Sequence, residues 1–231
     1  MRELPYDALL LGTGRKAKVD GLSLEAAGVR LGKDRVEVDE YLRTSNPNIY
    51  AAGDVAFPEK FTHAAMATAR LCVANALDGA NRRARELVIP HCTYTDPEVA
   101  QVGLTPRRAL EEGVPLDSYR LEMTKAERAF IDGEEEGFAA IYTRRGSGEI
   151  VGATLVAAHA GEMISELTLA ITQKIPLEAL ADRSTATRRR PRYSSGLPCN
   201  TPDPGISRRL ATNGKPLLPS LGIREMALHY D

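Results

Sequence analysis

The 231-residue chain has no tryptophan and only three cysteines. Cys72, Cys92 and Cys199 are far apart and odd in number, so they form neither a CxxC redox pair nor a cysteine metal site. We expect Cys72 and Cys92 to be buried free thiols, because free cysteine behaves as a small apolar residue. Cysteine therefore offers no obvious chemistry to this chain.

The chain also lacks a run of about 18 apolar residues, and no apolar signal-peptide core follows Met1. Its formal net charge of −1 gives no general attraction to nucleic acid or to an anionic membrane surface. We therefore expect a cytoplasmic protein that binds neither nucleic acid nor membrane. Hydrophobic residues make up 43% of the chain, which is enough for one large or two small globular domains.

The most informative stretch is residues 46–54, Asn-Pro-Asn-Ile-Tyr-Ala-Ala-Gly-Asp. An apolar strand over residues 49–52 runs into Gly53 and then Asp54. Gly53 lets another molecule approach the backbone closely, and Asp54 falls at the carboxyl end of the strand, where open α/β sheets bind ligands. A carboxylate at this place can accept hydrogen bonds from a polyhydroxyl ligand.

The amino-terminal region predicts further strands of the same α/β type. Residues 6–15 form a continuous apolar run closed by Gly12-Thr13-Gly14, which indicates a strand buried on both faces of a parallel sheet. Residues 36–39 alternate like a strand with one polar face. The glycines are not a full GxGxxG fingerprint, so a strand-to-loop turn is favoured over phosphate binding, and Gly14 remains only a candidate for cofactor contact.

A helix is predicted over residues 63–77, with Thr62 as its N-cap. Apolar side chains cover much of its circumference, so we expect the helix to be buried. The next segment, residues 78–86, is charged and contains glycine, which indicates a domain boundary.

The second half of the chain predicts an α+β domain. Helical spacing of Met163, Ile164, Leu167 and Ile171 indicates a helix with one face buried against a sheet. Thr105 and Pro106 mark the start of a shorter helix that ends near Glu112. Short links predict an antiparallel meander of strands, which we place at residues 90–95, 98–103, 116–123, 137–142 and 150–156.

Residues 46–54 resemble the second flavin-binding motif of the pyridine nucleotide-disulfide oxidoreductases, in the branch that includes dihydrolipoamide dehydrogenase and mercuric reductase. Residues 93–105 resemble the opening of the dimerisation domain of that family, and residues 12–29 resemble the element that closes its NAD(P)-binding domain. The resemblance implies α/β and α+β structure: a partial FAD/NAD(P)-binding segment followed by a dimerisation domain with an antiparallel sheet.

The resemblance also implies a cofactor site. Asp54 would bind the ribityl and phosphate region of FAD, next to Gly53. The amino end of the following helix would face the flavin ring, so that His63, Ala65 and Met66 line its edge. A histidine at a helix start is often only a cap, and this alternative stays open for His63.

Four parts follow from the resemblance. Residues 1–32 end the NAD(P)-binding domain, residues 33–86 are the C-terminal segment of the FAD-binding domain, residues 87–182 are the dimerisation domain, and residues 183–231 are a tail. The intact parent would pass a hydride from NAD(P)H via FAD to a disulfide. The redox CxxxxC pair and both GxGxxG motifs of the family do not occur here. We therefore expect no catalytic residue and a fragment that is inactive alone, and whether it is an enzyme stays open. The alternative is a dimerisation module that pairs with a second copy.

The composition changes abruptly after Asp182 to arginine-rich and proline-rich sequence. A basic tail for nucleic acid is one interpretation, and a frameshift is the other. When the frame is read from the third base of the Asp182 codon, the genetic code permits Ile-His-Cys-Tyr-Pro-Thr-Gln-Ala-Glu immediately after the first shifted codon. This run resembles the histidine–glutamate acid–base motif of the family. We favour an out-of-frame tail over residues 183–231. Codons that cannot spell this motif in the other frame would contradict it.

Overall fold

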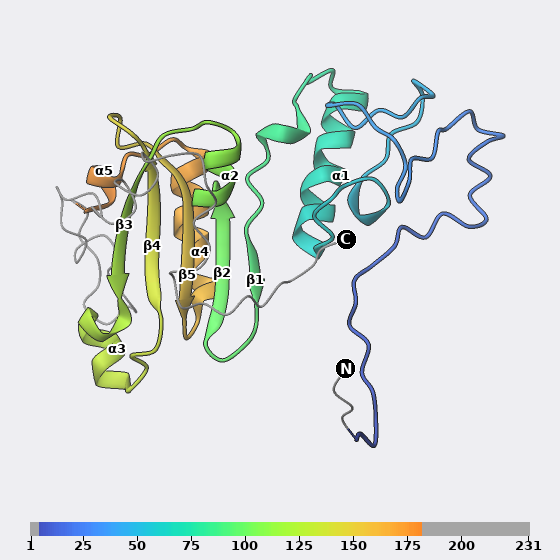
Figure 1. Ribbon diagram of the computed structural model, residues 1–231. Helices are drawn as coiled ribbons and strands as arrows, with labels where there is room; N and C mark the ends of the chain where they lie inside the picture. Colours follow the sequence, from blue (N-terminus) through green and yellow to red (C-terminus); the bar gives the residue numbers. More distant parts are fainter. Residues whose placement is uncertain (1–4, 182–231) are drawn as a thin grey trace. The chain divides into compact units, whose positions relative to one another are not determined.

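The computed structural model describes residues 5–181 (Figure 1). Within them the chain divides into two compact units, one ending at Ala84 and the other beginning at Arg85. The predicted boundary between residues 32 and 33 stays a prediction, and the predicted out-of-frame tail lies outside the described residues. No helix in the described part of the chain is both long and apolar enough to cross a membrane.

The first unit contains a short 3-10 helix, η1 (Gly53–Val55), and the long helix α1 (Thr62–Leu77). The predicted strands at residues 36–39 and 49–52 do not form as strands. Only isolated bridges are present there, between Leu31 and Val36 and between Arg43 and Tyr50. The described residues of this unit offer no neighbouring strand, and a strand needs a partner for its backbone hydrogen bonds. A small apolar cluster forms instead, around Val29, Val36 and Ala56.

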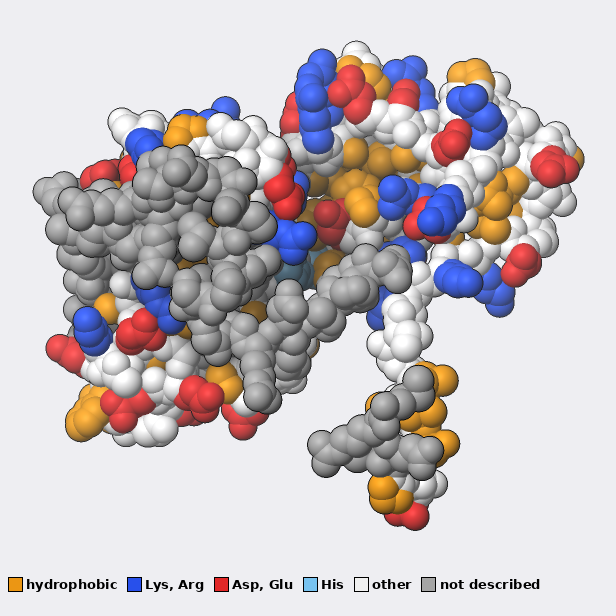
Figure 2. Space-filling model, viewed as in Figure 1, with side chains coloured by type: hydrophobic (Ala, Val, Ile, Leu, Met, Phe, Trp, Pro, Cys, Tyr) orange, Lys and Arg blue, Asp and Glu red, His pale blue; other side chains and the backbone are white. Residues whose placement is uncertain are grey.

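The predicted buried strand at residues 6–15 is also wrong for this structure. This segment has no regular structure, and Leu9, Leu10 and Leu11 are 68%, 96% and 72% exposed. Figure 2 shows hydrophobic side chains at the surface of the extended amino-terminal segment. The apolar run predicts a need for burial, but the described residues of the first unit form no sheet that could satisfy it.

Helix α1 forms almost where it was predicted, but two details of the prediction are wrong. Phe61, rather than Thr62, is the N-cap, and it provides no side-chain hydrogen bond to the helix. The helix is also not buried all round, because Val73 is 56% and Leu77 79% exposed. Buried side chains lie on one face only, at Ala64, Thr68 and Leu71. Apolar residues around the whole circumference left the packed face undetermined by the sequence.

The second unit is built on one five-stranded antiparallel sheet in the order β1-β2-β5-β4-β3. The predicted meander is confirmed for β3, β4 and β5, which pair in sequence order. β2, however, pairs with β5 rather than with β3. The strands are β1 (His91–Thr93), β2 (Glu98–Gly103), β3 (Leu116–Glu122), β4 (Phe138–Arg144) and β5 (Ile150–Ala157).

Helix α4 (Ala160–Thr172) packs on one face of this sheet, against β1, β2 and β5 (Figure 1). Ile164 and Leu167 are buried, as their spacing predicted, and Met163 and Ile171 pack against the same core. A hydrogen bond between residues far apart in sequence connects the first turn of α4 to the sheet: the backbone N–H of Gly161 donates to Oε2 of Glu98 in β2 over 2.9 Å. This unit therefore has a continuous core between helix and sheet.

The remaining elements are short. Helix α2 (Pro106–Glu111) begins as predicted, with Thr105 Oγ1 accepting from the backbone N–H of Arg108 at 3.2 Å. The others were not predicted: η2 (Ala84–Glu86), η3 (Met123–Lys125), α3 (Glu127–Asp132) and α5 (Leu177–Ala181).

Candidate functional site

The turn formed by Gly53 and Asp54 lies directly against the first turn of α1. Gly53 is buried and has φ +68°, and an ideal Cβ on it would lie 3.0 Å from Cβ of Ala65. Any side chain at this position would combine an unfavourable backbone conformation with a close contact. Glycine thus allows the turn and the helix start, including the predicted residues Gly53 and Ala65, to come together.

Hydrogen bonds fix the backbone of this turn. The N–H of Gly53 donates to Oγ1 of Thr68 over 2.9 Å. The carbonyl of Gly53 accepts from the N–H groups of Ala56 and Phe57 at 3.0 and 2.8 Å. Thr68 was not a candidate on sequence grounds. The sequence does not show which face of α1 is buried, so nothing in it marked Thr68; the structure buries the hydroxyl, which then needs a partner.

The carboxylate of Asp54 remains accessible, with 46% of its side chain exposed. Its ionic partner is Arg15, whose Nη1 lies 3.9 Å from Oδ2, and Arg15 is itself 66% exposed. Such an exposed pair is screened by solvent and holds the carboxylate only weakly. A ligand that offers hydroxyl donors can therefore compete for Asp54.

Reciprocal hydrogen bonds bring Arg15 into this region. Arg15 Nη1 donates to the carbonyl of Lys60, and Lys60 Nζ donates to the carbonyl of Arg15, both over 2.6 Å. Gly14, which precedes Arg15, is exposed with φ +111° and has no atom within 4 Å of its ideal Cβ position. Arg15 and Lys60 are cations that the sequence analysis missed, and no local motif marked them.

The start of α1 presents two of the other predicted residues to solvent. His63 is exposed and its ring stacks on Phe61, with centroids 5.4 Å apart and planes at 9°. Met66 is 53% exposed, whereas Ala65 is half-buried against the turn. The N-cap supplies no side-chain acceptor to the first backbone N–H groups, which gives this helix end a partial positive charge.

The two described cysteines are free and half-buried, rather than fully buried as predicted. Burial raises the pKa of the Cys72 thiol, and burial together with the nearby negative charge of Glu98 raises the pKa of Cys92. Both thiols therefore stay protonated at neutral pH. A reactive cysteine, in contrast, needs a lowered pKa. Among the described residues, no three His, Cys, Asp or Glu side chains gather as a metal site.

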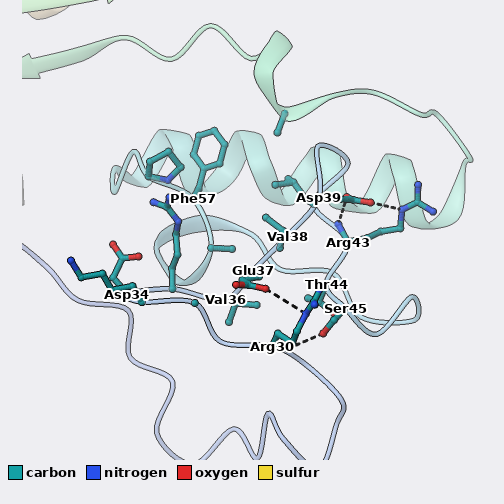
Figure 3. A pocket seen from close by; sticks show the side chains of 17 residues that line it. Arg30, Asp34, Val36, Glu37, Val38, Asp39, Arg43, Thr44, Ser45 and Phe57 are labelled. Carbon is teal, nitrogen blue, oxygen red and sulfur yellow. Dashed lines mark hydrogen bonds and ion pairs between the residues drawn. The ribbon is translucent and has the colours of Figure 1, made fainter.

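A separate hollow of about 760 Å³ lies in the first unit, beside the loops that precede η1 (Figure 3). Arg30 pairs with Glu37 at 3.4 Å and Arg43 pairs with Asp39 at 3.3 Å along its wall. Each of these two arginines thus has a carboxylate of the wall beside it. Asp54 does not line this hollow, so the two features are distinct.

Two family models match the sequence. The pyridine nucleotide-disulphide oxidoreductase model matches residues 1–70, and the dimerisation-domain model of the same family matches residues 89–188. The Gly53–Asp54 turn and α1 begin within the first match, and the five-stranded sheet lies within the second. The chain belongs to the pyridine nucleotide-disulphide oxidoreductase family, whose members depend on FAD and NAD(P).

Curated relatives and solved structures agree with this assignment. Mercuric reductase of Streptomyces lividans is 39% identical over 174 residues, and mercuric reductase of Staphylococcus aureus is 36% identical over 177 residues. These matches cover 75% and 76% of this chain but only 37% and 32% of the relatives, so the chain spans about a third of their length.

The structural matches are similarly partial. The HOCl-induced flavoprotein disulfide reductase RclA from Escherichia coli has a TM-score of 0.75 at 24% identity, which shows the fold alone. LpdA from Mycobacterium tuberculosis has a TM-score of 0.69 at 27% identity. The matches cover 83% and 85% of this chain, and 44% and 41% of those chains.

Proposed function

We propose that the Gly53–Asp54 turn and the first turn of α1 form the flavin-side half of an FAD site. The observation that carries the proposal is the close packing of Gly53 on Ala65, which places an accessible carboxylate beside a helix amino end. The carboxylate suits the hydroxyl donors of a ribityl chain. The helix end suits a ligand atom on which negative charge develops.

The residues of this turn fit one part of FAD. Asp54 would hold the ribityl and phosphate region, and Gly53 leaves the approach to the backbone open. Ala65, Met66 and His63 would line the flavin edge, and Gly14 would lie near the same ligand. Neither GxGxxG motif for an adenine dinucleotide occurs in the sequence, so this chain supplies half a site.

The parent activity that we propose is transfer of a hydride from NAD(P)H via FAD to a disulfide. FAD, when bound, supplies the two-electron chemistry, and the residues of this chain would hold and orient it. No redox cysteine pair of the CxxxxC type occurs in the sequence, and both described thiols have raised pKa values. We therefore propose that the chain is inactive alone.

Replacing Asp54 with asparagine is expected to weaken FAD binding by at least about tenfold, because a charge-assisted hydrogen bond is replaced by a neutral one. Titration of FAD with the full chain, followed by flavin fluorescence, measures the change. Asp20→Asn is the matched control, since Asp20 is an exposed carboxylate of the same unit and its loss should leave affinity unchanged. Equal affinities of D54N and the unaltered chain, or no binding by the unaltered chain, would contradict the proposal.

A second function is supported by the five-stranded unit. Its sheet and core are continuous, and its sequence matches a dimerisation domain. We propose that this unit pairs with a second copy of the chain, independently of flavin. Sedimentation equilibrium of the full chain should then give about twice the monomer mass of 25.1 kDa. A monomer at high micromolar concentration would rule out self-association, and a colourless dimer would favour the interaction module over the cofactor site.

A further inference from the structure

The hydroxyl of Thr68 joins the two halves of the proposed site. Thr68 is fully buried on α1, and its Oγ1 accepts from the N–H of Gly53 at 2.9 Å. The same hydroxyl donates to the carbonyl of Ala64 at 2.8 Å, with the carbonyl of Ala65 at 3.1 Å. One side chain therefore connects the residue before Asp54 with the first turn of the helix.

This hydrogen bond holds the orientation of the Ala52–Gly53 peptide, which leads into Gly53. Gly53 is buried, and its N–H donates to the Thr68 hydroxyl. Without the Thr68 hydroxyl the N–H would be left unsatisfied, and rotation of the peptide would be the available relief. The Gly53 carbonyl stays bonded to the N–H groups of Ala56 and Phe57, so the backbone of Gly53 itself must absorb the rotation. The change would tilt the next residue, Asp54, relative to α1.

We infer that Thr68 is a positioning residue of the proposed flavin site, acting on the ligand through the Gly53 peptide and Asp54. This inference rests on the proposed function. It assigns to Thr68 a role in recognising the polyhydroxyl and phosphate chain of a flavin nucleotide, although Thr68 itself is buried beneath the turn. A purely structural role would affect stability and leave the action of Asp54 unchanged.

Thr68→Val keeps the shape of the side chain and removes the hydroxyl. FAD affinity of the full chain should fall about fivefold, and Thr68→Ser should restore it. Thr44→Val is the matched control, because Thr44 is a buried threonine of the same unit whose hydroxyl forms hydrogen bonds with the backbone of Asn46 and not, among the described residues, with the Gly53 turn. This variant should lose stability but keep its FAD affinity.

A double-mutant cycle separates positioning from general loosening of the unit. In the Asp54→Asn background, Thr68→Val should change FAD affinity by less than about twofold, since the group it positions is already altered. A full fivefold loss in that background would show that Thr68 acts independently of Asp54 and would overturn the inference. If D54N lowered FAD affinity and the control Asp20→Asn did not, the flavin site itself would still be supported.

A measurement without flavin keeps the inference testable if FAD does not bind. In the amide NMR spectrum, Thr68→Val should speed hydrogen exchange of the Gly53 N–H at least about tenfold and shift the Asp54 resonance, while Thr68→Ser should leave both near their original values. Unchanged exchange at Gly53 or an unshifted Asp54 resonance in T68V would overturn the inference. Failure of FAD binding alone would instead contradict the proposed function.

Discussion

Replacing Leu167 with alanine is expected to lower the free energy of unfolding of the five-stranded unit by about 3 kcal/mol. Leu167 is fully buried where α4 meets the sheet, in the same core as Leu155 and Ile164. Truncation removes apolar contacts and leaves a cavity that a closely packed helix and sheet can fill only partly. Urea denaturation of the full chain, with hydrogen-exchange protection of the α4 amides as the probe, measures the lost free energy of unfolding.

Leu169→Ala provides a matched control two residues along the same helix. Leu169 is 59% exposed. Leu169→Ala therefore changes helix propensity and composition as Leu167→Ala does, but it creates no cavity. Its expected cost is within about 0.5 kcal/mol. If both variants lost the same stability, α4 would not pack on the sheet through the face that contains Leu167.

Gly152→Ala is expected to cost at least about 3 kcal/mol, for a different reason. Gly152 lies in β5 opposite Gly103 of β2, and a Cβ there would overlap the backbone carbonyl of Leu104. A backbone atom cannot move aside as a flexible side chain can, so β2 must shift away from β5. The same denaturation measurement, with loss of amide protection in β2, reports the effect.

The turn between β4 and β5 offers a control for this substitution. Gly146 has φ +80° and no atom within 4 Å of its ideal Cβ position. Gly146→Ala thus introduces backbone strain without steric overlap, and its expected cost is about 1 kcal/mol. A smaller loss for G152A than for G146A would mean that the close approach of β2 and β5 does not exist.

Local patterns predicted the second unit well because its elements depend on neighbouring residues. The spacing of Ile164 and Leu167 fixes the buried face of α4, and Thr105 caps α2 through a hydrogen bond within one turn. The short turn between Arg144 and Ile150 likewise fixes the pairing of β4 with β5, whereas β3 reaches β4 through a longer connection that contains η3 and α3. The pairing of β2 with β5 was missed, since it is decided by packing between segments distant in sequence.

The first unit was predicted less well for a physical reason. The apolar run at residues 6–15 becomes a strand only beside other strands, and the described residues of the first unit provide none. α1 shows the same dependence, because its apolar circumference did not reveal which face would pack. In both cases the sequence indicates which side chains prefer burial without supplying the surface that buries them.

The candidate site shows the same division. Gly53 and Asp54 stood out because glycine followed by a carboxylate after an apolar run has a direct chemical interpretation. Thr68 and Arg15 did not, because each contacts the turn from a segment far away in sequence. Their contributions depend on tertiary contacts, and the assignment of FAD contacts to individual residues stays a prediction.

The sheet order also has a consequence for the folding of the second unit. β4 pairs with β5 across a short turn and with β3 across the segment that contains η3 and α3, whereas joining Gly103 to Gly152 closes a longer loop of about 50 residues at a greater entropic cost. We therefore expect β3, β4 and β5 to pair first and β2 to be added late. Until β2 pairs with it, β5 is an edge strand with unpaired backbone groups. Such an edge can pair with a wrong strand. In a slowly folding chain, the strand most open to mispairing is therefore β5, the central strand of the finished sheet.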